Sequence, residues 1–212
     1  MRKRLERDAR REKILAGALE AFAAKGFGAT NREIADAAGM TSPGLIYHYF
    51  PSKEELLWAV VEAYAPPLRL LHQSDALMEL PLRDVLTRIA SAYLELFETP
   101  QRVALMRVVF GEGIRRPEIA ARFAAAGPVR MVAFLRAYFE RQMERGVLRR
   151  GDPDWAARAF IGPLVTVAVS KTVLGGAFDP AMTRAELVEN AVETFLHGMA
   201  AAAAAAPGGP EP

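Results

Sequence analysis

The 212-residue chain contains no cysteine and only three histidines. The absence of cysteine excludes disulfides, thiol catalysis and zinc sites built on cysteine. The histidines, His48, His72 and His197, lie too far apart in the sequence to form a local metal-binding motif. Neither a metal ion nor another cofactor is therefore expected.

Long apolar runs are also missing. A membrane-spanning helix needs about 20 consecutive apolar residues, whereas the most apolar stretch, residues 156–170, is interrupted by Arg158, Gly162 and Pro163. The N-terminus has the charge of the start of a signal peptide, but the charged run Ala9-Arg-Arg-Glu-Lys follows in place of an apolar segment. These features predict a cytoplasmic protein.

Motifs for nucleotide binding and for nucleophilic catalysis are absent as well. The sequence has no G-x-S-x-G elbow, no P-loop and no complete G-x-G-x-x-G, because Gly26-Phe-Gly and Gly111-Glu-Gly each lack the third glycine. Without cysteine, and with isolated histidines, a nucleophile and its base are hard to assemble. The protein is therefore not expected to be an enzyme.

The sequence does contain enough apolar residues for a packed core, and its charge is unevenly distributed. Apolar residues make up 51% of the chain and charged residues 25%, as in folded domains. Residues 1–53 hold ten lysines and arginines against six acidic residues, and six of the basic residues lie in the first eleven positions. A basic N-terminal arm suits the phosphate backbone of DNA, although a solvated helix start explains the same charges.

Helical spacing runs through nearly the whole chain. Ile14, Ala18 and Phe22 recur at four-residue steps, which is the period of an amphipathic helix. Glycine, proline and capping residues divide the pattern into about nine to ten helices, and no stretch alternates as a strand would, so the expected fold class is all-α. The expected helices cover residues 7–25, 32–38, 43–50, 53–64, 82–98, 101–111, 117–126, 128–145, 153–174 and 183–200.

Two short helices joined around a glycine, at residues 32–38 and 43–50, are typical of a helix-turn-helix. Thr30 or Asn31 is expected to cap the first helix, and Thr41 or Ser42 the second. Apolar residues at helical spacing predict which faces turn inward. The predicted core of this motif consists of Ile34, Ala35, Ile46 and Phe50.

Side chains on the other face of the second helix suit contact with DNA. The small residues at its start, Pro43 and Gly44, would let the backbone approach base edges closely. Tyr47 and Tyr49 carry hydroxyls long enough to reach phosphates on either side of a major groove. Lys53 would place a charge beside a helix N-terminus, and both attract phosphate. A small helical subdomain with an aromatic core is the alternative, but it leaves the tyrosines unexplained.

Two runs in this region resemble a known family. Thr30-Asn-Arg-Glu-Ile-Ala-Asp-Ala-Ala-Gly-Met and Gly44-Leu-Ile-Tyr-His-Tyr-Phe-Pro-Ser-Lys-Glu-Glu-Leu are similar to the DNA-binding domain of tetracycline-repressor (TetR) family regulators. The resemblance implies an all-helical homodimer that binds a palindromic operator and releases it when a small molecule binds the larger domain. A repressor is the implied role, and a transcriptional activator or a non-specific DNA-binding protein is the alternative.

The resemblance also implies a domain organisation and a set of DNA contacts. Residues 1–53 would form the DNA-binding domain with its basic arm, and residues 54–200 the ligand-binding and dimerisation domain. The composition of residues 201–212, an alanine run followed by Pro-Gly-Gly-Pro-Glu-Pro, predicts a disordered tail. The segment from Gly39 to Tyr47 is one residue longer than the commonest family pattern, and the extra residue is expected near Thr41. Phosphate contacts are predicted for Thr30, Asn31, Tyr47, Tyr49 and Lys53. Base contacts are predicted for Arg32, Ser42, Pro43, Gly44, Leu45 and Tyr47.

Aromatic and methionine side chains gather between residues 93 and 160. Adaptable apolar walls suit a hydrophobic effector, although most of these side chains are expected to be ordinary core. A lipophilic effector with an acidic group, such as an acyl-CoA, is one hypothesis, because Arg107 or Arg136 could anchor that group. The residues predicted to line the ligand pocket are Tyr93, Phe97, Met106, Arg107, Phe110, Met131, Phe134, Tyr138 and Phe160.

The last two expected helices carry stripes of small or branched residues that allow close helix packing. By the family resemblance, these helices pair with their twins in a four-helix bundle. The alternative is that both stripes pack within one chain. The predicted dimer interface consists of Ala159, Gly162, Thr166, Val169, Val173, Leu187, Ala191 and Phe195.

Overall fold

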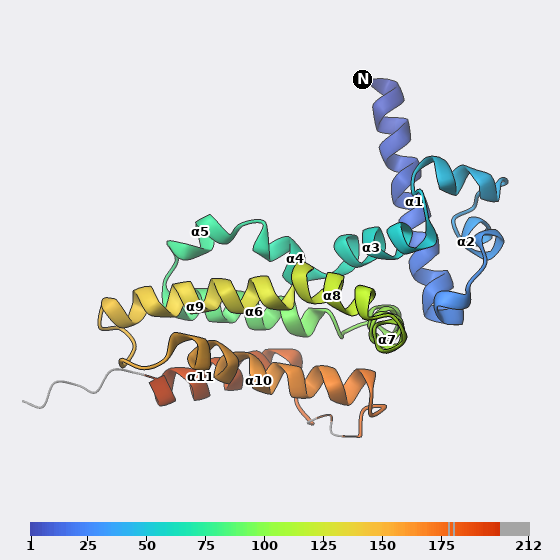
Figure 1. The fold of residues 1–212 in the computed structure, drawn as a ribbon. Coiled ribbons are helices and arrows are strands. Elements are labelled where there is room, and N and C mark those ends of the chain that lie inside the picture. Colours follow the sequence, from blue (N-terminus) through green and yellow to red (C-terminus); the bar gives the residue numbers. More distant parts are fainter. Residues whose placement is uncertain (178, 180, 200–212) are drawn as a thin grey trace, which may run out of the picture.

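The computed structural model describes residues 1–177, 179 and 181–199, so the predicted tail at residues 201–212 lies outside the described part. The described residues form eleven α-helices and two 3-10 helices, with no strand among them (Figure 1). The all-α fold class predicted from the helical spacing is confirmed. Within the described residues, no helix combines the length and the apolar character that a membrane crossing requires.

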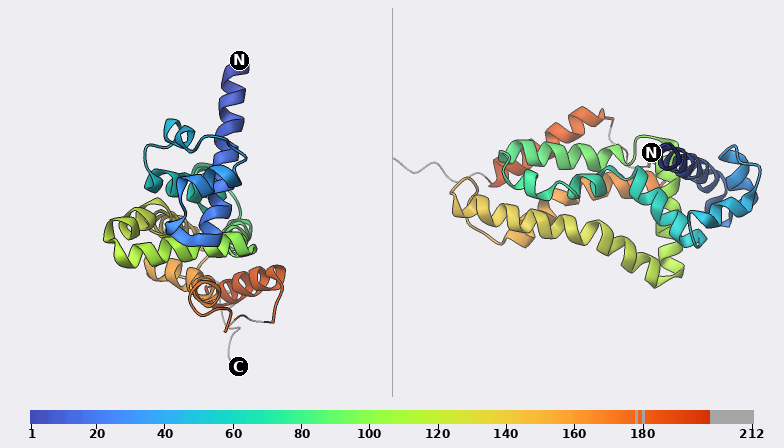
Figure 2. Two further views of the ribbon diagram at one scale, coloured as in Figure 1. Left: turned by 90° about the vertical axis from the view of Figure 1, so that its right-hand side faces the viewer. Right: turned by 90° about the horizontal axis from the view of Figure 1, so that it is seen from above.

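The chain begins with a small N-terminal group of helices and continues into a larger one. The first group contains α1 (Arg2–Lys25), η1 (Gly26–Gly28), α2 (Asn31–Ala37), η2 (Pro43–His48) and α3 (Lys53–Tyr64). The second contains α4 (Pro66–Leu71), α5 (Ser74–Met78), α6 (Leu82–Glu95), α7 (Pro100–Arg115), α8 (Pro117–Ala126), α9 (Pro128–Glu144), α10 (Pro153–Thr172) and α11 (Arg184–Met199). The molecule is elongated, with α2 and η2 at one end and α6, α9, α10 and α11 extending away from them (Figures 1 and 2).

Several helix boundaries differ from those expected. The first helix begins at Arg2 rather than at Arg7, and α7 continues to Arg115 although Gly111 and Gly113 were expected to end it. Gly113 has a packing role inside the helix, because a Cβ there would lie 3.3 Å from the Cβ of Ala120 in α8. The short helices α4 and α5 were not expected, since five or six residues are too few to show a helical period.

Two hydrophobic cores hold the helices together. The first core packs α1, α2, η2 and α3 against α7, and its fully buried members include Phe22, Ile34 and Leu105. The second core lies among α6, α9, α10 and α11 and includes Tyr138 and Phe160. Because the first core reaches from α2 to α7, the hydrophobic packing is continuous across residue 53, the predicted domain boundary.

Two glycines fix the geometry of the helix-turn-helix. A Cβ at Gly17 in α1 would lie 2.4 Å from the backbone nitrogen of Ala38, so only glycine lets the end of α2 pack this closely on α1. Gly39 has a φ of 65° and ends α2, and the N–H of Met40 donates to the carbonyl of Ala35 at 2.8 Å. This αL ending, in which a backbone bond runs back across the turn, lets the chain reverse toward η2.

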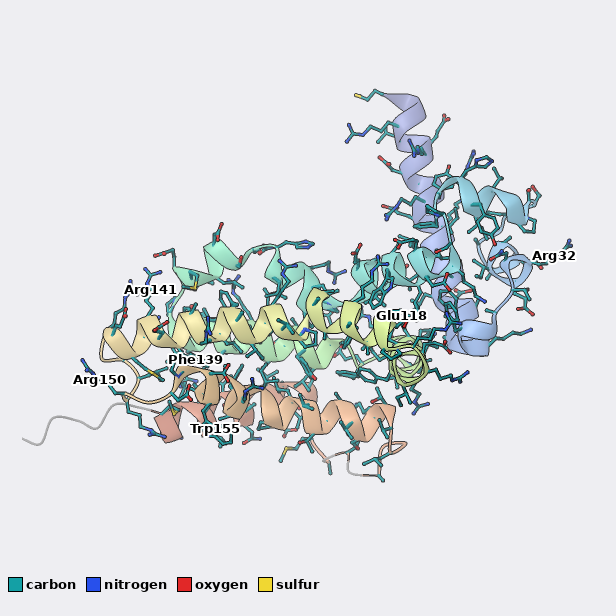
Figure 3. The ribbon with its side chains drawn as sticks, in the orientation of Figure 1. Arg32, Glu118, Phe139, Arg141, Arg150 and Trp155 are labelled. Atoms are coloured by element: carbon teal, nitrogen blue, oxygen red, sulfur yellow. The ribbon has the colours of Figure 1, made fainter. Side chains whose placement is uncertain are left out.

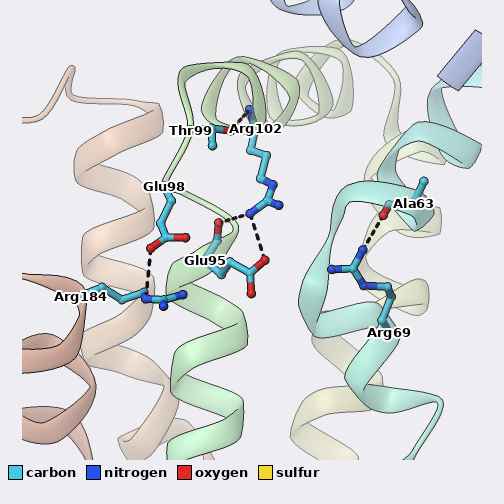
Figure 4. Close-up of polar contacts among 7 residues, drawn as sticks. All are labelled: Ala63, Arg69, Glu95, Glu98, Thr99, Arg102 and Arg184. Carbon is cyan, nitrogen blue, oxygen red and sulfur yellow. Dashed lines mark hydrogen bonds and ion pairs between the residues drawn. The ribbon is translucent and has the colours of Figure 1, made fainter. Parts of the chain in front are cut away.

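Polar contacts position α6 and α7 relative to α11 (Figure 4). The guanidinium of Arg102 in α7 donates to the carbonyl of Glu95, at the end of α6, at 2.8 Å. Arg184, the first residue of α11, pairs with Glu98 at 3.1 Å. In the same view, Arg69 of α4 donates to a carbonyl in the last turn of α3. These contacts satisfy helix-end carbonyls or join neighbouring elements around the larger domain.

Candidate functional site

The first helix of the helix-turn-helix begins with a capping box. Thr30 is the cap: its Oγ1 accepts from the N–H of Glu33 at 3.3 Å, and its own N–H donates to Oε2 of Glu33 at 2.8 Å. Lys25 contacts the other carboxylate oxygen at 2.5 Å. The hydrogen bonds from Lys25 and Thr30 lower the pKa of Glu33 to about 2. The Glu33 carboxylate therefore stays ionised at neutral pH. The Thr30 hydroxyl acts in the cap only as a hydrogen-bond acceptor, so its proton takes no part in the cap.

The second helix of the motif, η2, is a 3-10 helix over Pro43–His48, whereas an α-helix reaching Phe50 was expected. Ser42 precedes it but makes no side-chain capping hydrogen bond, so the predicted cap is not formed. The segment is short and begins with Pro-Gly, a residue without an N–H followed by a poor helix former. Pro51 then disfavours helical backbone at the preceding residue. Few consecutive α-helical hydrogen bonds, from the N–H of one residue to the carbonyl four residues earlier, can therefore form.

The residues predicted to contact DNA lie at the surface of this end of the molecule. All of them are exposed or half-buried, and the predicted core residues Ile34, Ala35, Ile46 and Phe50 are buried. Tyr47 is 53% exposed, and its hydroxyl accepts a hydrogen bond from Nδ2 of Asn31 at 2.5 Å. Arg32 points outward from α2 in Figure 3. The hydrogen bond between Asn31 and Tyr47 thus joins the exposed surfaces of α2 and η2.

Lys53, the first residue of α3, is held beside an aromatic ring. Its ammonium lies 4.8 Å from the centre of the Phe27 ring, and the guanidinium of Arg116 lies 5.1 Å from the same ring. Ser52 caps α3 by accepting from the N–H of Glu55 at 3.1 Å. Partial burial is the main cause that lowers the pKa of Lys53. The cation therefore stands at a capped helix N-terminus, where a phosphate can approach it.

A charged junction, which the sequence did not reveal, joins the start of α3 to α8 and to Arg116, the residue that precedes α8. Arg122 donates to both carboxylate oxygens of Glu55, at 2.6 and 3.1 Å, and its guanidinium lies 4.9 Å from the ring of Trp58. Arg116 pairs with Glu54 at 3.1 Å. The hydrogen bond from Arg122 is the main cause that lowers the pKa of Glu55. We call Glu54, Glu55, Arg116 and Arg122 the α3–α8 clamp.

A cavity of about 270 Å³ lies where the two hydrophobic cores meet. Five residues of the predicted pocket line it: Tyr93, Phe97, Met106, Phe110 and Met131. The other lining residues were missed because several belong to the unexpected helix α4 or to the ends of α8 and α9. They are Ala65, Pro67, Leu68, Leu71, Leu96, Phe123, Gly127, Pro128, Val132, Ile161 and Val165.

Four residues predicted for the pocket lie elsewhere. Phe134, Tyr138 and Phe160 belong to the second core, where the hydroxyl of Tyr138 donates to the carbonyl of Leu80 at 2.7 Å. Arg107 is exposed, and it donates to two carbonyls at the C-terminal end of α10, at 3.0 and 2.9 Å. Helical periodicity predicts that a side chain faces inward, but it does not distinguish a filled core from a cavity.

The predicted dimer interface is divided between surface and core. Ala159, Gly162, Thr166, Val169 and Val173 form an exposed stripe along α10. Trp155, labelled in Figure 3, lies near the start of the same helix and is 71% exposed.

The stripe on α11 instead packs within the chain. Phe195 is buried, with its ring centre 5.0 Å from that of Phe139 and 5.4 Å from that of Phe160, so its prediction as an interface residue is wrong. Leu187 and Ala191 are half-buried against the second core. In the single chain, Phe195 therefore packs internally, whereas the α10 stripe is exposed.

A helix-turn-helix with an exposed outer surface, joined to a helical domain with an apolar cavity, is typical of DNA-binding transcriptional regulators. Two family models match the chain: "Bacterial regulatory proteins, tetR family" over residues 14–60, and "AefR-like transcriptional repressor, C-terminal domain" over residues 84–200. The chain belongs to the TetR family of transcriptional regulators. The family membership agrees with the prediction of a regulator rather than an enzyme.

Known proteins resemble the chain in sequence and in fold. The regulator UidR of Escherichia coli K12 is 31% identical over 119 residues, which cover 52% of this chain and 55% of UidR. The chain thus aligns with about half the length of this relative. A TetR-family regulator from Mesorhizobium loti has a TM-score of 0.70 at 25% identity, covering 91% of this chain and 98% of that one. The flavonoid-responsive regulator FrrA has a TM-score of 0.61 at 28% identity, covering 92% and 100%.

Proposed function

We propose that the protein is a ligand-responsive transcriptional repressor of the cytoplasm. A homodimer binds a palindromic operator, and a small hydrophobic effector releases it. The observation that carries this proposal is the position of the cavity. Phe123 of α8 lines the cavity, and the neighbouring Arg122 holds Glu55 in the first turn of α3. An effector that displaces α8 therefore moves the helix that directly follows the DNA-contacting segment.

The release mechanism follows from differential binding. A ligand shifts an equilibrium between two conformations only as far as it binds one of them better. We propose that the ligand-free arrangement, with the α3–α8 clamp closed, sets the two helix-turn-helix motifs of the dimer at the spacing of the operator half-sites. An effector that favours a displaced α8 then disfavours this spacing. The description of FrrA as flavonoid-responsive supports small-molecule control in a related protein.

The homodimer is supported by the exposed stripe on α10. Contiguous apolar surface on a soluble protein marks an interaction site. Small residues such as Ala159 and Gly162 let two copies of α10 approach closely, and a two-fold axis places the same face of each copy in contact. A dimer of this kind presents two copies of η2, so its operator is a palindrome.

A transcriptional activator and a non-specific DNA-binding protein are the alternatives. A reporter gene separates activator from repressor, because deletion of the protein raises transcription from a repressed promoter and lowers it from an activated one. Footprinting separates specific from non-specific binding. A repressor protects a short palindrome that overlaps the promoter, whereas a non-specific binder protects the whole DNA uniformly.

Lys53→Ala is expected to weaken binding to all DNA sequences alike, by about threefold to tenfold. Because the variant removes a phosphate contact, it is also expected to reduce the slope of log affinity against log salt by about 0.9. Fluorescence anisotropy with operator and random DNA over a salt series measures both effects. Arg88→Ala is the control, since Arg88 is an exposed cation on α6. Weaker binding to the operator alone would contradict a phosphate contact.

Arg122→Lys tests whether the α3–α8 clamp supports operator binding. Lysine keeps the charge but cannot form both hydrogen bonds to Glu55. An exposed ion pair contributes about 0.5–1 kcal/mol, so operator affinity is expected to fall about twofold to fivefold, as measured by gel shift.

The matched control is Arg141→Lys, because Arg141 forms the same two-bond pair with Glu79, at 2.8 and 3.2 Å, on α9. We expect this variant to bind operator like the wild type. Equal decreases in the two variants would show that the clamp has no particular role in DNA binding.

A further inference from the structure

The wall of the cavity carries no charged side chain. Of the residues that line it, only Tyr93 has a side-chain oxygen or nitrogen, and the rest are aliphatic, aromatic, methionine, proline or glycine. Burying a carboxylate or an ammonium without a partner costs several kcal/mol. The wall therefore disfavours any ligand that places a charge inside the cavity.

The two arginines that could have anchored an acidic ligand lie outside the cavity. Arg107 is bound to carbonyls at the end of α10. Arg136 is exposed and lines a shallow depression that adjoins the cavity through Pro128 and Val132. Arg158, in the same depression, pairs with Asp154 at 2.8 Å. The cationic side chains of this region are thus at the surface, and an acyl-CoA or another acid would find no partner for its charge within the cavity.

Tyr93 supplies one polar atom at an otherwise apolar wall. Its ring packs on Phe97 with 5.7 Å between ring centres, and its hydroxyl makes no hydrogen bond within the described residues. Every fully buried side-chain oxygen or nitrogen among these residues has a hydrogen-bond partner. Because the Tyr93 hydroxyl has no such partner, it is not fully buried, and a small molecule can reach it. Burial raises the pKa of Tyr93 to about 12, which keeps the hydroxyl neutral at physiological pH.

The size of the cavity limits the ligand further. Its volume is about 270 Å³, just below the range of about 300–1,000 Å³ that is common for drug-sized ligands. At one edge, a Cβ on Gly127 would lie 2.8 Å from Cδ2 of Leu68, so the wall there leaves no spare room. A small ligand fits this space without a large rearrangement.

We propose that the cavity selects small, uncharged, lipophilic molecules with one hydrogen-bonding oxygen or nitrogen, which pairs with the Tyr93 hydroxyl. The inference rests on the proposed function in taking this ligand to be the effector. It adds the chemical class: alcohols, phenols, ketones and esters bind, whereas carboxylates and amines of the same shape do not. The hydroxyl both donates and accepts, so a ligand oxygen in either role satisfies it.

The test uses the full-length protein and three probes of one shape. The probes are 2-naphthol, which is uncharged with one hydroxyl; 2-naphthoate, which is charged; and 2-methylnaphthalene, which has no polar atom. Calorimetric titration at neutral pH is expected to show 2-naphthol binding at least about tenfold more tightly than 2-naphthoate. Tyr93→Phe is expected to weaken 2-naphthol binding about threefold to tenfold and to leave 2-methylnaphthalene binding unchanged.

Tyr93→Phe keeps the ring and removes no internal hydrogen bond, so an unchanged Tm checks that the fold is intact. Arg136→Gln is the second variant, and it is expected to leave 2-naphthol binding unchanged. The inference is overturned if 2-naphthol does not bind, if 2-naphthoate binds more tightly through Arg136, or if Tyr93→Phe weakens naphthol and methylnaphthalene equally. If naphthol is selected as expected but leaves operator binding unchanged, the ligand class stands and the proposed function fails.

Discussion

Val169→Glu is expected to convert the proposed dimer into a monomer and to lower its affinity for the full operator by at least about 100-fold. Val169 lies within the α10 stripe and is 40% exposed in the single chain. In the proposed dimer, a glutamate there would place two unpaired charges against apolar surface, which costs several kcal/mol. Operator affinity then falls because a monomer binds only one half-site, whereas a dimer binds both at once.

The matched control for this variant is Val147→Glu, which makes the same change at a valine that is 47% exposed and outside the stripe. It is expected to remain a dimer and to bind the operator normally. Sedimentation equilibrium gives the oligomeric state, and gel shifts with full and half operators give the affinity. A Val169→Glu variant that stays dimeric would place the dimer interface elsewhere on the molecule.

Tyr47→Ala is expected to lower operator affinity about tenfold to 100-fold, while dimerisation and Tm stay nearly unchanged. The side chain is half exposed at the outer surface of η2, so its removal leaves no cavity in the first core. The decrease has two sources: direct contact with DNA, and the hydrogen bond from Asn31 that links α2 to η2.

Tyr47→Phe separates these two sources. It keeps the ring but removes the hydroxyl, so an intermediate decrease indicates that the hydroxyl contributes through a phosphate or through Asn31. Because Asn31 is itself a predicted phosphate contact, the link is isolated by combining Tyr47→Phe with Asn31→Ala: the two changes lower affinity by less than the sum of their separate effects if the side chains act through each other. Operator affinity equal to that of the wild type in Tyr47→Ala would show that η2 does not face the DNA.

Features set by neighbouring residues were predictable from the sequence. Helices α3 and α8 begin and end where expected. Ser52 caps the start of α3 and a proline follows its end, whereas a proline begins α8 and Gly127 follows it. Periodicity likewise predicted the buried faces of α2 and η2. The helical type of η2 was not predicted, because its six residues are too few to distinguish the 3-10 period from the α-helical period.

Features that depend on distant parts of the chain were not predictable in the same way. The partners Arg122 and Glu55 lie 67 residues apart, and no local pattern in the sequence indicates that they meet. Phe195 and Val169 both sit on apolar stripes, yet one packs into the second core and the other is exposed. The difference lies in how α10 and α11 pack against α6 and α9, which only the tertiary structure reveals.

The most direct test of ligand-responsive repression is a footprint of the full-length protein on genomic DNA that it selects. The titration is repeated with and without a saturating compound that calorimetry shows to bind the cavity. We predict protection of a short palindrome that overlaps a promoter, and its disappearance when the cavity is filled. Uniform protection of the DNA, or a palindromic footprint that the compound leaves unchanged, would contradict the proposed function.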